Sequence, residues 1–182
     1  MATICYRGKM NSVFINRIIR ACKLDVSLYE EVEADQSATL QAALVVVLSS
    51  IAAGIGAISL GASNFLMAPL LSLLSWYIWA YLIYFIGAKI FPESGTQADH
   101  GQLLRTIGFS SAPGLIRIFG FTPELMSVVF IGSGIWMMVA MVIAVRQALD
   151  YESTWRAIGV VVIGFLVQAF FLVIILRIFG SS

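Results

Sequence analysis

The chain is poor in charged residues. Asp, Glu, Lys and Arg make up 12% of its 182 residues, against about 25% in an ordinary soluble domain, and 60% of the residues are hydrophobic. With a mean hydropathy of +0.94, the chain is too apolar to fold around one core in water, so the bilayer must be its solvent. The formal net charge of +1 gives no field that could hold nucleic acid, and no nucleic-acid partner is expected.

The chain also has few of the side chains that catalytic and metal sites need. Two cysteines and one histidine cannot form a closed zinc site, and no base and acid are paired around a Ser or Cys nucleophile. No carboxylate lies within the expected membrane spans, so an intramembrane proton relay lacks its acid. We therefore expect no enzyme activity, no metal and no cofactor.

Long uncharged runs divide the chain into membrane spans. Residues 36–88 contain no charged side chain, which is more than one helix needs to cross a hydrocarbon layer of about 30 Å, so this run must hold two passes. The pattern predicts an all-α, polytopic integral membrane protein with five transmembrane helices. An amphipathic cytoplasmic segment at 1–39 precedes a domain at 40–179, with spans near 40–60, 65–88, 102–121, 125–145 and 157–176.

The basic residues predict the orientation of the chain in the membrane. With five spans, all Lys and Arg residues except Arg117 and Arg177 fall on the same side as the amino terminus. Basic flanks are retained on the cytoplasmic side of a membrane. We therefore expect a cytoplasmic amino terminus and a carboxyl terminus on the opposite side.

A basic amphipathic pattern precedes the first span. Its apolar residues, among them Phe14 and Ile18, share one arc of a helix, and its cations, Arg17, Arg20 and Lys23, lie on the other side. Such a helix can lie in the headgroup layer with its cations toward anionic lipid, or it can pack its apolar stripe on the protein's own spans. The pattern leaves both arrangements open.

Four carboxylates, Glu30, Glu31, Glu33 and Asp35, follow this basic pattern. They lack the turn glycine and the twelve-residue spacing of a calcium loop. We interpret the cluster as a solvated connector that balances the charge of the neighbouring basic helix.

The first span carries small residues four positions apart, including Ala52 with Gly56 and Ala57 with Gly61. Such a face lets another helix backbone approach closely. It could serve packing within the bundle or association with a second copy of the chain.

The expected third span, residues 102–121, contains a helix breaker. Pro113 has no amide hydrogen, so the helix should bend or break there. Ser110 and Ser111 could bond the carbonyl that this break frees, or they could bond a neighbouring span.

Two arginines, Arg105 and Arg117, stand about 18 Å apart along this span. They can snorkel to opposite interfaces, or they can line a polar cavity or a lipid-headgroup site at the broken helix. Gln168, in the fifth span, is expected to be buried and could bridge to the serines. The candidate functional or packing residues are Arg105, Gly108, Phe109, Ser110, Ser111, Pro113, Gly114, Arg117 and Gln168.

The third span contains the string GFSSAP, residues 108–113, which resembles the third-helix signature of the Yip (Ypt-interacting protein) domain family. The segment at 24–42 reads LDVSLYEEVEADQSATLQA and is similar to the lead-in of bacterial members. The resemblance implies a five-span protein with a cytoplasmic amino terminus, here in a bacterial inner membrane. Eukaryotic relatives are implicated in binding Rab-type GTPases, but their D-L-Y-G-P-type signature has no match in this chain, so that partner is not carried over.

Two functions follow as hypotheses. The first is a non-catalytic, membrane-organising adaptor or accessory subunit, whose partners are the lipid bilayer and other membrane proteins or a second copy. The second is a small transporter, channel or lipid-moving protein that uses the kinked third helix.

Overall fold

The computed structural model describes residues 2–58 and 67–179, and these residues form helices and connecting turns with no strand. The predicted all-α fold class is confirmed. The elements in chain order are α1 (Ala2–Cys22), α2 (Val26–Ala34), α3 (Ala38–Gly56), α4 (Met67–Tyr84) with its π-helical end η2 (Phe85–Ile90), α5 (His100–Ser110), the 3₁₀ helix η3 (Ala112–Phe121), α6 (Pro123–Ala148) and α7 (Thr154–Phe179).

Among these elements, four helices are long and apolar enough to cross a membrane. They are Ala38–Gly56, Met67–Ile90, Pro123–Ala148 and Thr154–Phe171. At most 33% of each spanning window is buried inside the protein, so most of their apolar surface faces outward. Apolar surface of this extent is stable only in hydrocarbon or against another protein, which confirms an integral membrane protein.

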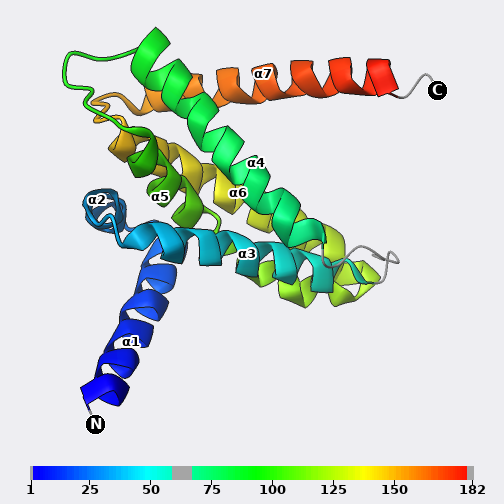
Figure 1. Cartoon of the computed structure of the whole chain (residues 1–182). Coiled ribbons are helices and arrows are strands. Elements are labelled where there is room, and N and C mark those ends of the chain that lie inside the picture. Colours follow the sequence, from blue (N-terminus) through cyan, green and yellow to red (C-terminus); the bar gives the residue numbers. More distant parts are fainter. Residues whose placement is uncertain (1, 59–66, 180–182) are drawn as a thin grey trace.

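The third expected span is not one helix. The α-helix α5 ends at Ser110, and η3 begins at Ala112 with Pro113 in its first turn. The predicted break is confirmed, because Pro113 has no amide hydrogen with which to continue the α-helical ladder. Together, α5 and η3 run from the end of the molecule near α2 to the opposite end (Figure 1). The count of five spans stays a prediction, and the expected connection between the spans near 40–60 and 65–88 lies outside the described residues.

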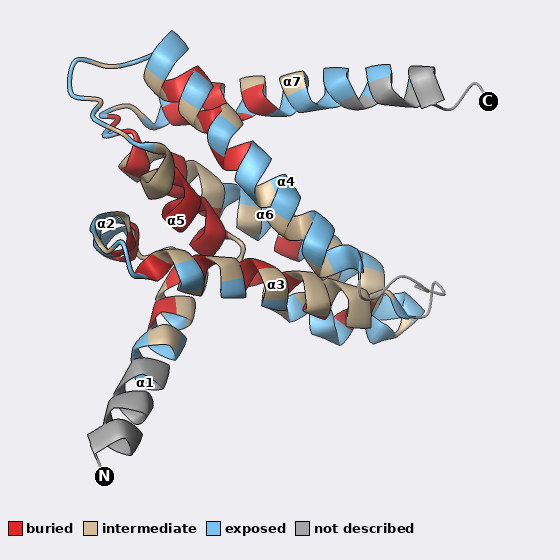
Figure 2. Cartoon of the chain, viewed as in Figure 1, coloured by how far each residue is buried: buried red, intermediate tan, exposed pale blue. Residues whose placement is uncertain are grey.

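The helix α5 lies at the centre of the fold. Leu103 and Ile107 belong to a core shared with α4, α6 and α7, whereas Phe109 belongs to a second core shared with α1, α2 and α3. Figure 2 shows buried residues along nearly the whole of α5 and only sparsely along the outer part of α7. The central position of α5 fixes where the broken third segment can place its side chains.

The third segment packs against α3 at unusually short range. A Cβ atom on Gly108 would stand 2.6 Å from the Cβ of Ala42, and a Cβ on Gly114 or on Gly56 would overlap Ser49 or the Arg117 carbonyl. The close approach therefore depends on glycine. Gly56, on the small-residue face of the first span, is used for packing within the chain.

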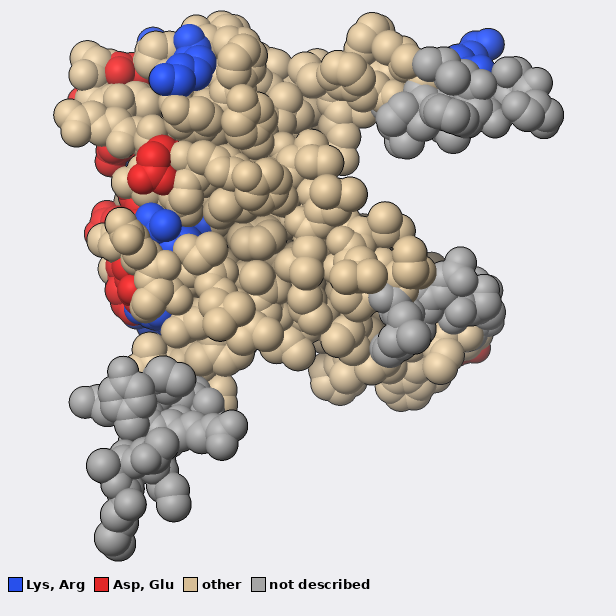
Figure 3. Space-filling view, viewed as in Figure 1, with Lys and Arg blue, Asp and Glu red and all other residues tan. Residues whose placement is uncertain are grey.

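Charge is concentrated at one end of the molecule. On the face shown in Figure 3, most charged side chains gather along one edge, over α2 and the start of α5, and the broad middle of the face is uncharged. This edge also holds the connections before α5 and before α7. The arrangement leaves a wide uncharged band for the hydrocarbon layer.

Candidate functional site

The amino-terminal helix is held to α2 by ion pairs. Arg17 is buried, and its three nitrogens donate to Glu31 Oε1 at 2.8 Å, Gln41 Oε1 at 2.9 Å and Asp35 Oδ2 at 2.7 Å. Arg20 donates to Asp25 Oδ2 at 2.8 Å and to Glu31. The acidic residues of α2 and its flanks therefore neutralise Arg17 and Arg20 within the chain, and the arrangement of α1 in the headgroup layer stays a prediction.

The ion pairs also set the charge of the acidic cluster. The hydrogen bond from Ser37 lowers the pKa of Asp35 most, and the hydrogen bond from Arg17 lowers it further. Partial burial opposes them, but the pKa stays below its usual range. Burial by itself would raise the pKa of Glu31, but the hydrogen bonds of Arg20 and Arg17 lower it. The interpretation of a connector that balances the basic helix is confirmed for these two carboxylates.

The apolar arc of α1 is divided between two environments. Phe14 and Ile18 pack against the core beneath α1, whereas Ile15 is 56% exposed and Ile19 is 47% exposed. Lys23 is exposed at the end of the helix. Part of the apolar arc therefore packs on the protein itself, and contact of the rest with the headgroup layer stays a prediction.

Arg105 fastens α2 to the centre of the fold. Its side chain is buried, and Nε donates to the carbonyl oxygens of Val32 at 2.9 Å and Glu33 at 3.2 Å, while Nη2 donates to the Glu33 carbonyl as well. The last carbonyls of a helix lack intrahelical donors and carry partial negative charge. Arg105 therefore caps the carboxyl end of α2, and its snorkelling to a membrane interface stays a prediction.

Tyr151 caps the end of α4 and η2, and the sequence pattern did not predict this role. Its hydroxyl contacts the carbonyl oxygens of Gly87 at 2.9 Å and Phe91 at 2.7 Å. The only available signal was an aromatic residue within the polar connection before α7. The backbone carbonyls that it bonds belong to a π-helical turn that no side-chain pattern announces.

Several residues on either side of the break are structural. Phe109 is fully buried, Gly108 and Gly114 permit the approach of α3, and the Ser110 hydroxyl donates to the Ile107 carbonyl at 2.7 Å. Ser110 therefore bonds its own helix rather than a neighbouring span. Ser111 and Arg117, together with Ile107 before the break, line a cavity.

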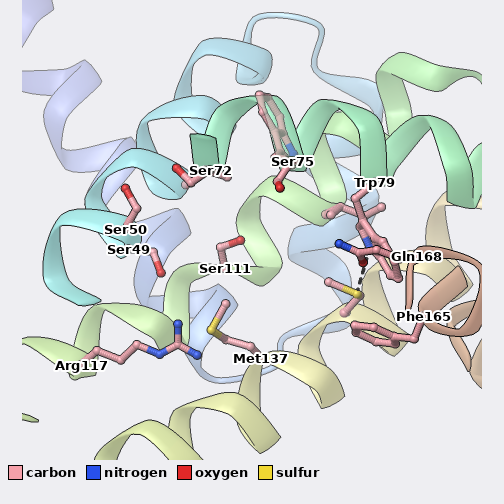
Figure 4. A pocket seen from close by; sticks show the side chains of 14 residues that line it. Ser49, Ser50, Ser72, Ser75, Trp79, Ser111, Arg117, Met137, Phe165 and Gln168 are labelled. Carbon is pink, nitrogen blue, oxygen red and sulfur yellow. Dashed lines mark hydrogen bonds between the residues drawn. The ribbon is translucent and has the colours of Figure 1, made fainter. Parts of the chain in front are cut away.

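A cavity of about 270 Å³ lies beside the break, and its mainly apolar lining carries serine, arginine and glutamine side chains. Figure 4 shows Ser111 and Arg117 on the third segment opposite serines of α3 and α4, with Gln168 of α7 at one end. The lining residues include five serines and one arginine but no carboxylate; they are Val46, Ser49, Ser50, Ser72, Ser75, Trp76, Trp79, Ile107, Ser111, Arg117, Met137, Met141, Phe165 and Gln168. The break at Pro113 thus brings Ser111 and Arg117 together at this cavity.

Arg117 has only weak partners in the described part of the chain. Nε donates to the Ser133 hydroxyl at 2.9 Å, and the guanidinium carbon lies 5.4 Å from the centre of the Phe130 ring. No ion pair joins it to a described carboxylate. A cation so placed beside hydroxyl groups is suited to bind an anionic or strongly polar group.

Gln168 is not buried, contrary to the expectation from its place in an apolar helix. It is exposed on α7 and makes no hydrogen bond to Ser110 or Ser111. The physical reason is that α7 packs against α4 mainly through its first half, near Gly164. Gln168 instead lines the junction between this cavity and a neighbouring apolar groove.

Comparison with known proteins agrees with the fold and the membrane location. The Yip1 domain family matches residues 28–176, from α2 to the outer part of α7. The comparison with curated proteins and the comparison with solved structures gave no match. The resemblance to bacterial members in particular is not borne out by the family match. Since the match extends over most of the chain and includes α5, the break and η3, the chain belongs to the Yip1 domain family of membrane proteins.

Proposed function

We propose that this protein is a non-catalytic, membrane-organising adaptor or accessory subunit, with its amino-terminal helices as the contact surface. The observation that carries the proposal is the exposed apolar row on α1, Ile15 and Ile19, on a helix that lies crosswise to α3 (Figure 1). Arg17 and Arg20 hold this row in a fixed orientation through α2. A rigid, exposed apolar row at a membrane interface suits docking of a membrane protein or a second copy.

Photocrosslinking in native membranes tests the adaptor role. A photoreactive amino acid at Ile19 is expected to give a discrete adduct with one membrane protein or with a second copy. The same probe at Ser27, at the exposed start of α2, serves as the control. Adducts with lipid alone, or identical adducts from both positions, would count against an adaptor.

The proposal includes a topology of five passes, with a cytoplasmic amino terminus and the carboxyl terminus on the opposite side of the membrane. It is supported by the run of α5 and η3 from one end of the molecule to the other, and by the gathering of charge near α2. An α-helix and a 3₁₀ helix of these lengths extend about 35 Å when placed end to end, enough for one crossing. Reporter domains at the two termini are expected on opposite sides, and reporters on the same side would contradict five passes.

A second candidate function, a small transporter, channel or lipid-moving protein, is favoured by one specific observation. Arg117 turns into a cavity directly beside the Pro113 break, where a closely packed bundle would have left no space (Figure 4). Reconstituted protein is expected to move a polar solute or a labelled lipid across vesicles, and Arg117→Gln is expected to abolish that movement. Movement that is unchanged in Arg117→Gln would remove the basis for this function.

A further inference from the structure

We propose that the cavity beside the break binds the phosphate of an anionic phospholipid, whose acyl chain lies in the groove between α4 and α7. The inference deepens the second candidate function by naming a ligand class. It rests on the cavity and the groove, and it holds whether or not the protein moves lipid from one leaflet to the other.

The charge of the cavity selects an anion. Arg117 uses Nε for the Ser133 hydroxyl, and its two terminal nitrogens have no acceptor among the described residues. By contrast, all three nitrogens of Arg17 are bonded within the chain. A guanidinium has five N–H donors in a planar fork that fits two phosphate oxygens at once. Because the lining has no carboxylate, no acidic side chain of the cavity competes with a phosphate for the free N–H donors of Arg117.

Serine hydroxyls line the same cavity as Arg117. Ser49 and Ser50 come from α3, Ser72 and Ser75 from α4, and Ser111 from the break. Ser50 and Ser72 already donate to the Val47 and Pro69 carbonyls of their own helices, each at 2.8 Å. The hydroxyls of Ser49, Ser75 and Ser111 remain to donate to phosphate oxygens. Figure 4 shows these serines around the space into which the Arg117 side chain extends.

The neighbouring groove is what distinguishes a lipid from a free anion. A groove of about 350 Å³ runs between α4 and α7, lined mainly by apolar side chains such as Leu82 and Phe171. It shares Ser75, Trp79 and Gln168 with the cavity, so the two spaces meet at these residues. A phosphate with an apolar chain fits this continuous pair of spaces, whereas inorganic phosphate leaves the groove unused.

The test uses the purified full-length protein in neutral detergent and measures retained ligand by native mass spectrometry. Three ligands are compared: phosphatidylglycerol, diacylglycerol with the same chains and no phosphate, and glycerol phosphate with no chains. Phosphatidylglycerol is expected to bind at least about tenfold more tightly than either of the others. Equal binding of diacylglycerol would overturn the phosphate site, and equal binding of glycerol phosphate would overturn the lipid as its occupant.

Variants locate the binding. Arg117→Gln is expected to weaken phosphatidylglycerol binding about tenfold or more, while Arg156→Gln, which removes one charge from the exposed end of the molecule, leaves it unchanged. Leu82→Trp, which fills the groove and keeps Arg117, is also expected to weaken binding, and it decides the matter if Arg117→Gln fails to fold. Unchanged binding in Leu82→Trp or in a folded Arg117→Gln variant contradicts the proposal. Binding without any lipid movement would reject only the transport function.

Discussion

Arg105 and Arg117 stand on the two halves of one broken segment, and their surroundings are opposite. Arg105 is buried and bonded to the carbonyl end of α2, whereas Arg117 faces a cavity with a hydroxyl and an aromatic ring as its described partners. The first cation holds the collar, by which we mean α1, α2 and the connections before α5 and α7. The second is left available for a ligand. The role of a cation within an apolar segment therefore follows from the acceptors that it bonds in the fold, and its spacing in the sequence does not predict that role.

The largest effect is expected from breaking the collar at Arg105. Arg105→Gln leaves the Val32 and Glu33 carbonyls without their charged donor, at a cost of about 3 kcal/mol of stability. We expect a lower unfolding temperature in detergent and faster proteolysis of α1 and α2. Lys23→Gln, a change at an exposed cation, is the control, and equal losses in both variants would contradict the capping role.

A somewhat smaller effect is expected where η3 packs on α3. A leucine at Gly56 must displace the Arg117 backbone carbonyl, and such overpacking costs about 2 kcal/mol. Gly132→Leu on α6, where a Cβ meets no atom within 4 Å, is the matched control. Gly56→Leu is expected to lower the unfolding temperature and to weaken phosphatidylglycerol binding, because it shifts Arg117. Stability equal to that of Gly132→Leu would show that the close approach is not essential.

Removal of the Tyr151 hydroxyl tests the collar on its other side. Tyr151→Phe leaves the Gly87 and Phe91 carbonyls without this donor, and a loss of about 1 kcal/mol is expected. Hydrogen exchange should rise at the end of α4 and not in η3. The control is Tyr81→Phe, at a side chain that is 56% exposed, and it is expected to change neither stability nor hydrogen exchange. If Tyr151→Phe raised hydrogen exchange only in η3, Tyr151 would not stabilise the end of α4.

The smallest effect is a pH dependence of the collar. Burial, followed by the negative charge of Asp150, raises the pKa of Glu33 to about 7, with Glu30 and Asp99 adding to the rise and Arg105 opposing it. Between the ordinary value and about 7, the folded state holds more protons than the unfolded state. The contribution of Glu33 to the free energy of unfolding is therefore greatest at low pH and is lost as the pH rises toward 7.

Thermal unfolding at several pH values checks this prediction. Glu33→Gln is expected to raise the unfolding temperature by a few degrees at pH 8 and to flatten the dependence between pH 5 and 7. Glu124→Gln, at the start of α6 and outside the collar, is the control. A steeper pH dependence in Glu33→Gln would reverse the assigned sign.

Much of the fold follows from charge gaps and lengths. The span expected near 40–60 is found at Ala38–Gly56, and the span expected near 125–145 lies within Pro123–Ala148. The break at Pro113 also follows, because a missing amide hydrogen acts locally. These features depend on properties of single segments, which the sequence displays directly.

The partners of polar side chains could not be predicted in the same way. Arg17 reaches Glu31 because the chain reverses between α1 and α2 at Leu24, a non-glycine residue with φ 59°. Arg105 finds its acceptors in a helix end that is distant along the chain, and Gln168 is exposed because only part of α7 is packed. Such outcomes depend on how helices meet, which a pattern on one helix does not contain.

Thermal unfolding of the wild type, Arg105→Gln and Arg117→Gln, each with and without phosphatidylglycerol, tests the separation of the two arginines most directly. Arg105→Gln is expected to unfold at a lower temperature and still to be stabilised by the lipid. Arg117→Gln is expected to unfold near the wild-type temperature in detergent and to gain nothing from the lipid. If both variants lose the same property, the two arginines do not have separate roles.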